Sequence, residues 1–395
     1  MERKFVLKDY ISKYGNTSFE ELPLNESDIL VFATISYGDF MAVPRVLKKY
    51  DVFNDEISLN VFSKHETLKK ISMRYLSGPV VFYNFYKNIL NCSRYKNLRI
   101  TRIRNVFSKS KNTQFFAMVY LIDNLKFIIY RGTDNTIPGW KEDVLTAIEN
   151  EVPSQKLALE YIKGILELDK DSNYYIIGHS KGGNLAYYAF FNLDDELKKR
   201  IITCYNLDGN GFKNDKFDYE KYKNQIIKIV PNDDIVGTLF DVNKNVIVKS
   251  SSFSIFAHDV LTWNLNPKDM TKILRVKSLT RSSQVFKIVF NKWVSSLTNE
   301  EIQDFVDFVF MLVDVNKSRT VNDFIKNLVN SRHKYLKSIE KYPEKRKKLI
   351  KKISRDFLTD YFQVYIELSP ITQKIKLMAK NRIEEEGEQQ SEKKK

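Results

Sequence analysis

The sequence predicts an α/β fold built on a mostly parallel, doubly wound sheet. Between residues 98 and 265, short apolar runs with strand-like residues alternate with segments of helical periodicity, which is the order expected of strands and helices in a parallel sheet. The polar clusters in this part of the chain directly follow predicted strands, and functional loops in such sheets lie at the carboxyl ends of strands. Beyond residue 265 the apolar spacing is helical only, so a helical region is expected there.

The 395 residues divide into four predicted segments. We expect residues 1–97 to form a helical entry segment that packs on the main domain, and residues 98–265 to form the α/β core. Residues 266–380 should be a helical C-terminal region, with a capping box of Thr298 and Glu301 at one helix start. Residues 381–395 are strongly charged and are expected to be a disordered tail.

The strands of the core are predicted from their short apolar runs. A turn at Asp123-Asn124 separates the second from the third, and a helix over about 154–168 precedes the fourth. The predicted strands are residues 98–103, 115–121, 127–130, 174–178, 201–207, 226–230 and 246–248.

The composition is that of a globular protein with an excess of positive charge. It has 64 Lys and Arg against 49 Asp and Glu, a formal net charge of +15, which favours anionic partners. No motif for nucleic-acid binding accompanies the charge, so nucleic acid is not expected as a partner. Two cysteines, Cys92 and Cys204, do not make a disulfide framework and indicate a reducing compartment. Without an apolar run of about 18 residues, the protein is predicted to be soluble and cytoplasmic.

The stretch from Tyr174 to Ala186 predicts a strand, a sharp turn and a helix. Its spacing Gly178-x-Ser180-x-Gly182 is that of a nucleophile elbow, in which a serine occupies a strained turn between close-packed backbones. A turn without chemistry would give the same short pattern. A phosphate loop does not fit, because Lys181 precedes the glycines and no Gly-Lys-Ser or Gly-Lys-Thr follows. No cofactor or metal is therefore expected.

A serine hydroxyl needs a base before it can attack, and that base should follow the elbow. Only His258 and His333 come after Ser180. His258 ends the strand-containing part of the chain, whereas His333 lies in a Lys- and Arg-rich helical segment. We therefore predict His258 as the base.

These motifs, together with Arg131-Gly132-Thr133 and the acidic loops, resemble those of α/β-hydrolase lipases of the class 3, fungal type. The run from Tyr130 through Trp140 to Asp143 is similar to the lipase FRGT…NWxxD pattern. The chain looks still more like a bacterial lipase-like family that shares the GHSKGGNLA elbow, the DGxGF turn and the HD…W segment. The resemblance implies an α/β-hydrolase fold, with Trp140 and Asp143 as structural or lid residues.

The resemblance also implies a role for each matched position. Ser180 corresponds to the nucleophile and His258 to the general base. The backbone N–H groups of Thr133 and Lys181 would form the oxyanion hole. The Lys181 side chain is not needed for that role, and we expect it to be solvated or to face an anion.

Three carboxylates compete for the acid that orients the histidine. Asp234 is preferred, because Asp234-Ile235-Val236 is similar to the lipase D-x-V motif. Asp233 would serve after a shift of one residue, and Asp208, after the preceding strand, remains a third candidate. A carboxylate that does not serve as the acid is expected to cap backbone N–H groups in its turn.

Taken together, the sequence predicts a serine hydrolase that cleaves ester bonds, with lipid or acyl esters as expected substrates. An esterase, a thioesterase or an acyltransferase would use the same serine chemistry. No large amphipathic lid is evident between Asp143 and Ser154. The alternative from another class is a catalytically silent hydrolase fold that serves as a binding or interaction module.

A basic amphipathic helix is predicted near residues 337–364. Its apolar stripe either packs on the hydrolase domain or lies on an anionic membrane, which the lysines would attract. The stripe contains Leu349, Ile350, Ile353, Phe357, Tyr361 and Val364, and it is flanked by Lys345, Arg346, Lys347 and Lys348.

Overall fold

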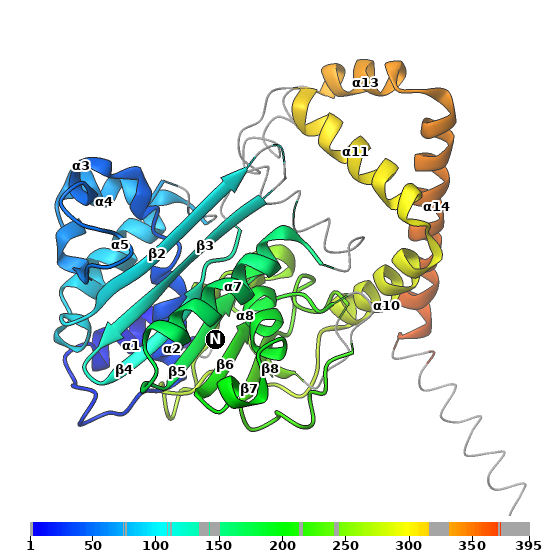
Figure 1. The fold of residues 1–395 in the computed structure, drawn as a ribbon. Coiled ribbons are helices and arrows are strands. Elements are labelled where there is room, and N and C mark those ends of the chain that lie inside the picture. The colour runs from blue at the N-terminus through cyan, green and yellow to red at the C-terminus, as the bar shows by residue number, and fades with distance from the viewer. Residues whose placement is uncertain are drawn as a thin grey trace, which may run out of the picture.

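The computed structural model describes residues 3–73, 75, 77–108, 110, 113–133, 142, 151–212, 216–240, 245–315, 332–369 and 372. Its centre is one mixed sheet (Figure 1), whose eight described strands lie side by side in chain order. The strands are β1 (Ile57–Ser58), β2 (Arg99–Ser108), β3 (Thr113–Ile122), β4 (Leu125–Tyr130), β5 (Tyr174–His179), β6 (Ile201–Leu207), β7 (Ile226–Pro231) and β8 (Val246–Val248).

The direction of the strands changes at β4. Strands β1 to β4 pair antiparallel, and β4 to β8 pair parallel. The connection between β3 and β4 is the predicted turn, in which Asp123 has a φ of 50°, and so short a connection can join only antiparallel strands. The parallel half brings the ends of β4 to β7 to one edge of the sheet.

All seven predicted strands are present, and each overlaps its predicted range. The short strand β1 lies in a segment for which only helices were expected. It pairs with β2 over two residue pairs, and so brief a run leaves no alternation in the sequence.

The described helices fall into three groups. Those before the sheet are α1 (Leu7–Tyr14), α2 (Glu26–Ile35), α3 (Pro44–Leu47), α4 (His65–Ile71) and α5 (Pro79–Leu90), with 3-10 turns η1 (Phe40–Ala42), η2 (Leu59–Phe62) and η3 (Ser93–Tyr95). Those between strands or just after them are α7 (Pro153–Leu168), α8 (Lys181–Phe191), α9 (Asp195–Lys198), η4 (Ser254–His258) and η5 (Val260–Thr262). The C-terminal group is α10 (Arg281–Ser296), α11 (Asn299–Val315), α13 (Arg332–Lys341) and α14 (Glu344–Glu367).

Helices cover both faces of the sheet, with α7 and α8 on the near face in Figure 1. Along β3, Phe115 and Val119 join the apolar core beneath α7 and α8, while Phe116 and Tyr120 join the core on the opposite face, with α1 and α2. Because both sides are buried, β3 reads as a continuous apolar run rather than an alternating one. The N-terminal helices thus belong to the same packed body as the sheet.

The C-terminal helices share a small core of their own, to the right in Figure 1. Trp293 of α10, Ile302 and Val306 of α11 and Ile353 of α14 are buried together. The predicted capping box is present, because the N–H of Thr298 donates to Glu301 at 2.9 Å and the N–H of Glu301 to the Thr298 hydroxyl at 3.1 Å. Among the described helices, none combines the length and the apolar character needed to cross a membrane.

Candidate functional site

Ser180 lies in the sharp turn between β5 and α8, as predicted. Its backbone has φ 58° and ψ −132°, a region that non-glycine residues rarely occupy and that stores strain at functional sites. The Ser180 N–H donates to the Leu207 carbonyl at 2.9 Å, which ties the turn to the end of β6. The serine is half-buried.

The elbow glycines are required by close backbone packing. A Cβ on Gly178 would lie 1.9 Å from the Gly182 carbonyl oxygen, and one on Gly182 would lie 2.1 Å from the Tyr130 carbonyl oxygen. Real Cβ atoms do not approach backbone oxygens this closely. The first turn of α8 therefore packs directly on β4 and β5, which presents Ser180 at the edge of the sheet.

His258 lies beside the elbow, with its ring centroid 4.6 Å from that of His179. Its Nδ1 is 2.7 Å from Asp208 Oδ2, and both side chains are buried. The Nδ1–H donates to the carboxylate, which leaves Nε2 as the proton acceptor of the ring. Asp208 follows β6 with a φ of 55°, a second strained residue in the cluster.

Asp234, the acid preferred from the sequence, lies further from His258 than Asp208 does. Its Oδ1 is 4.0 Å from His258 Nδ1, and its Oδ2 accepts the N–H groups of Val236 and of Gly237, the latter at 2.9 Å. The direct hydrogen bond to the histidine is thus made by Asp208, because β6 adjoins the elbow strand β5 and β7 does not. This geometry replaces the preference for Asp234 that the D-x-V motif suggested.

Asp233 faces away from the histidine. Its carboxylate accepts the hydroxyls of Thr280 at 2.7 Å and Ser282 at 3.2 Å at the start of α10. Asp233 therefore links the loop after β7 to the start of α10 through side-chain hydroxyls, whereas the expected capping of backbone N–H groups is made by Asp234.

The loop that bears His258 is held by three successive residues. The Ala257 carbonyl accepts the Trp263 indole N–H at 2.9 Å, and the His258 carbonyl accepts from His179 Nε2 at 2.8 Å. Asp259 accepts hydroxyls of the N-terminal segment, that of Tyr75 at 2.7 Å and that of Ser77. These contacts give a structural reason for the histidine, aspartate and tryptophan of this motif.

His179 and Tyr37 are site residues that the sequence analysis missed. Tyr37 contacts His179 Nδ1 at 2.6 Å. Because Nε2 must be the donor to the His258 carbonyl, Nδ1 accepts the Tyr37 hydroxyl proton. Burial lowers the pKa of His179 well below its ordinary value, and the nearby His258 adds to the shift, so the ring is neutral. His179 stood next to the serine in the motif, but nothing in the sequence indicated Tyr37.

The predicted oxyanion residues lie against the elbow. A Cβ on Gly132 would be 3.1 Å from the Ser180 Cβ, so the turn after β4 that contains buried Thr133 borders the serine. Lys181 is the first residue of α8, where backbone N–H groups have no partner within the helix.

Of the two expectations for the Lys181 side chain, exposure to solvent is wrong and contact with an anion is confirmed. The side chain is 2% exposed, and its Nζ donates to Glu142 at 2.9 Å and to the Gln114 carbonyl at 2.7 Å. Glu142 also accepts the N–H groups of Gln114 and Ser154, so this ion pair joins α8, β3 and the start of α7. Trp140 and Asp143 lie outside the described residues. His333 is exposed on α13 and does not belong to the cluster.

Asp208, Asp234 and His258 place three possible metal-ligand atoms within 4.8 Å of one another. The 2.7 Å contact between His258 and Asp208 is a hydrogen-bond distance, whereas two tetrahedral ligands at about 2.0 Å from a metal lie on the order of 3.3 Å apart. The cluster therefore fits a charge-assisted hydrogen bond better than a metal centre.

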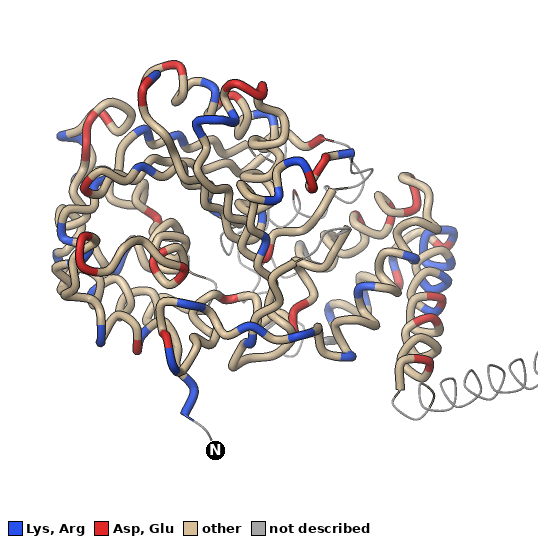
Figure 2. Tube along the Cα trace, turned by 90° about the horizontal axis from the view of Figure 1, so that it is seen from below, with Lys and Arg blue, Asp and Glu red and all other residues tan. Residues whose placement is uncertain are grey.

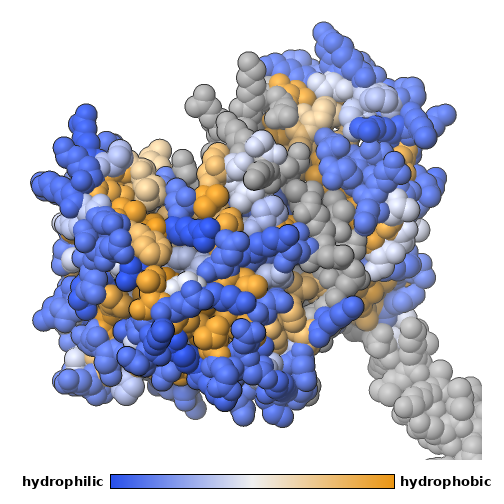
Figure 3. Space-filling model, in the orientation of Figure 1, coloured by the Kyte–Doolittle hydropathy of each residue, from blue (hydrophilic) through white to orange (hydrophobic). Residues whose placement is uncertain are grey.

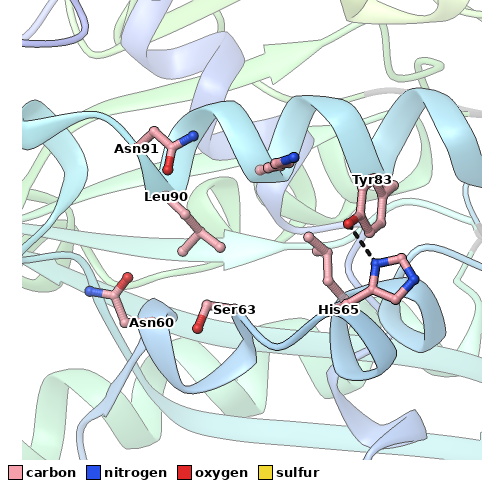
Figure 4. A pocket seen from close by; sticks show the side chains of 8 residues that line it. Asn60, Ser63, His65, Tyr83, Leu90 and Asn91 are labelled. Atoms are coloured by element: carbon pink, nitrogen blue, oxygen red, sulfur yellow. Dashed lines mark hydrogen bonds between the residues drawn. The ribbon is translucent and has the colours of Figure 1, made fainter.

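A shallow hollow of about 290 Å³ lies elsewhere, among η2, α4 and α5 (Figure 4). His65 and Tyr83 face each other across one end of it, with His65 Nδ1 2.8 Å from the Tyr83 hydroxyl. Its lining residues include none of the Ser180 cluster, and it is not part of the candidate site.

Comparisons with known proteins place this chain in a family. A search of curated proteins found no match. Among solved structures, a mutant form of MDLA from Penicillium cyclopium is 12% identical, with 56% of this chain and 78% of that chain covered and a TM-score of 0.34. The native Rhizomucor miehei lipase propeptide complex is 13% identical, with 60% of this chain and 80% of that chain covered and a TM-score of 0.35.

The Mbeg1-like family model matches residues 89–311, which is more than half of the chain. The protein is therefore a member of the Mbeg1-like family.

Proposed function

We propose that the protein is a serine hydrolase that cleaves ester bonds through an acyl-enzyme on Ser180. The observation that supports this most directly is the buried contact of 2.7 Å between His258 Nδ1 and Asp208 Oδ2 beside the strained serine. It fixes the imidazole tautomer with Nε2 free of its proton, as a general base requires. Asp208 is the acid of the proposed triad.

In the proposed reaction His258 Nε2 removes the Ser180 hydroxyl proton as Oγ attacks the ester carbonyl carbon. The negative charge that develops on the carbonyl oxygen is stabilised by the N–H groups of Lys181 and Thr133. Loss of one such donor typically costs about 10²–10³ in rate. The tetrahedral intermediate then collapses, and His258 returns the proton to the departing alcohol. A water molecule, activated by the same histidine, attacks the acyl-enzyme and releases the acid.

An apolar acyl group is the proposed substrate feature. Phe253 and Phe256 are 64% and 62% exposed, and their rings pack edge to face at 5.9 Å. They belong to the segment that leads directly into His258. Exposed aromatic side chains so close to a polar catalytic cluster favour an ester with an apolar chain.

The proposal is tested with a fluorophosphonate probe, which reacts only with an activated serine. We expect the wild-type protein to be labelled at Ser180 and to hydrolyse p-nitrophenyl esters, with rates that depend on acyl-chain length. Ser180→Ala should lose both activities while remaining folded, and His258→Ala should be nearly as inactive because triad members act as a unit. His333→Ala is the matched control and should retain full activity. Absence of labelling in the folded wild-type protein would point instead to a silent fold used for binding.

A further inference from the structure

Two carboxyl groups, not one, are buried behind His258. Asp208 and Asp234 are both fully buried, and with His258 their ligand atoms lie within 4.8 Å of one another. The histidine proton goes to Asp208 Oδ2. A triad needs only one of these carboxyls, so Asp234 requires its own explanation.

The surroundings of Asp234 distinguish its two oxygens. Oδ2 accepts the backbone N–H groups of Val236 and Gly237. Oδ1 lies 4.0 Å from His258 Nδ1 and, among the described residues, receives no N–H donor. Carboxylate oxygens of Asp234 and Asp208 lie within 4.8 Å of one another, so a proton on Asp234 would lie next to Asp208.

Electrostatics favour such a proton. Burial raises the pKa of the Asp234 carboxyl well above its ordinary value, and the neighbouring Asp208 carboxylate raises it further. A proton held between the two carboxyls would act in the same direction. His258 and the Gly237 N–H act in the opposite direction, but both effects are smaller than those of burial and of Asp208. His179 is neutral, and Asp233 is turned toward Thr280. Two adjacent buried carboxyls in such a setting favour a single shared negative charge.

We propose that Asp234 is a positioning residue, whose protonated carboxyl donates a hydrogen bond to Asp208 and thereby orients the carboxylate that holds His258. Its catalytic consequence rests on the proposed hydrolase function. A carboxylate that accepts a second hydrogen bond is less basic and stabilises the imidazolium less strongly. Asp234 should therefore keep His258 unprotonated, and active as a base, at lower pH than Asp208 alone would.

Substitutions at the two positions have different expected results. Asp234→Asn retains a neutral donor, so kcat/KM should stay within about threefold and the acid limb of its pH profile should not move. Asp234→Ala removes the donor, so the acid limb should move to higher pH by about half a unit to one unit, with a fall in kcat. Asp208→Asn should lower kcat by about 10⁴, because the wrong imidazole tautomer is then held.

Two outcomes would overturn the proposal. If Asp234 is an ionised carboxylate, Asp234→Asn removes a negative charge near His258, and the acid limb moves to lower pH. If Asp234 itself is the triad acid, Asp234→Asn is as inactive as Asp208→Asn.

A second measurement does not depend on turnover. A carboxyl that keeps its proton in the folded protein loses it on unfolding above a pH of about 3.9, so the folded state binds more protons and stability falls as pH rises. Asp234→Asn has no carboxyl proton to lose on unfolding, so its stability lacks this dependence on pH. Between pH 5 and pH 8 the unfolding equilibrium constant of the wild type should rise relative to that of Asp234→Asn, by up to tenfold per pH unit.

Asp233→Asn is the matched control for this measurement and should follow the wild type. A wild-type to Asp234→Asn ratio that does not change with pH would show that Asp234 is ionised and would refute the proposal. If the ratio rises as expected while no ester is hydrolysed, the proton on Asp234 is established and only the hydrolase function fails.

Discussion

At the scale of single residues, His258 is positioned through its backbone as much as through its ring. The His258 carbonyl is bound by His179, whose other nitrogen accepts the Tyr37 hydroxyl. Each of these groups is buried, so a lost partner would leave a polar atom without a hydrogen bond in an apolar environment. Such a loss costs about 1–3 kcal/mol. Tyr37 thus supports the histidine loop although it is distant in the sequence.

We predict that Tyr37→Phe lowers both stability and activity. Without the hydroxyl, His179 Nδ1 is left unsatisfied, and the free energy of unfolding should fall by about 1–3 kcal/mol. If His179 then shifts, kcat should fall by up to about 10²-fold with little change in KM, since small misplacements of catalytic groups act on the reaction step. Denaturant unfolding and ester hydrolysis measure the two effects.

The control is Tyr83→Phe, which removes a hydroxyl that bonds the exposed His65. It should change stability by less than about 0.5 kcal/mol. Equal effects of the two substitutions would contradict a special role for Tyr37.

The extent to which the site was predictable differs from residue to residue. Ser180 could be located from its immediate neighbours, because Gly178 and Gly182 mark the close packing of the elbow. The choice among Asp208, Asp233 and Asp234 depends on which strand adjoins β5, and a run of aspartates does not encode strand order. For Lys181 an anion was one of the two expectations, but the sequence did not identify Glu142 as that anion or indicate that the pair is buried, since lysine usually reaches solvent.

At the scale of elements, the first turn of α8 packs so closely on the parallel strands that a Cβ on Gly182 would have no room. It lies against β4, β5 and the end of β6, with Gly182 over Tyr130 and Gly183 next to Asn206. The helix also holds the loop after β6, because Asn184 Nδ2 donates to the carbonyls of Asn210 and Gly211 at 3.2 and 3.1 Å. Placement of α8 therefore also affects Asp208.

We predict opposite effects for two glycine-to-alanine substitutions. Gly182→Ala would force a Cβ against the Tyr130 carbonyl, and the shift of α8 should cost at least about 1–3 kcal/mol. Gly164→Ala, inside α7, meets no atom within 4 Å and should stabilise the protein by about 0.5–1 kcal/mol, because alanine loses less entropy in a helix. Thermal unfolding of both variants checks the signs. Stabilisation by Gly182→Ala would show that the elbow is packed more loosely than described.

Prediction of the elements succeeded where a repeated pattern was long enough to detect. The strands from β2 to β8 and the helix α7 carry such patterns, and each overlaps its predicted range. What periodicity could not supply was the pairing direction of the early strands, which depends on turn length, or the two-residue strand β1.

At the scale of the whole molecule, the excess positive charge is spread over the surface. Figure 2 shows Lys and Arg interspersed with Asp and Glu along the C-terminal helices. At the start of α14, Arg346 pairs with Asp304 of α11 at 3.2 Å and Lys347 pairs with Glu344 at 2.5 Å. The predicted stripe is buried at Ile350 and Ile353, and Ile353 lies in the small core with Trp293 of α10 and Ile302 of α11. Figure 3 shows apolar groups on this part of the surface. Leu336 of α13 and Leu358 and Phe362 of α14 are exposed.

We predict that the basic start of α14 does not anchor the protein to an anionic membrane. Replacing Lys345, Arg346, Lys347 and Lys348 by Gln should leave sedimentation with anionic vesicles unchanged at low salt, because the adjacent apolar residues are already buried. Free lysines near such a surface would contribute about 1 kcal/mol each. Binding that is lost on this replacement, or in higher salt, would establish a peripheral membrane contact instead.

The hydrogen bonds from Tyr37 and Tyr75 also have a consequence for biosynthesis. Tyr37 precedes its partner His179 by 142 residues, and Tyr75 precedes Asp259 by 184. A growing chain emerges from the ribosome with its N-terminus first. Neither tyrosine can therefore form its hydrogen bond until the partner residue has been synthesised. If the proposed triad is correct, Ser180 is synthesised before His258 and can become reactive only after residue 263 has emerged and docked. Probe labelling of stalled nascent chains would thus report when the two ends of the domain have joined.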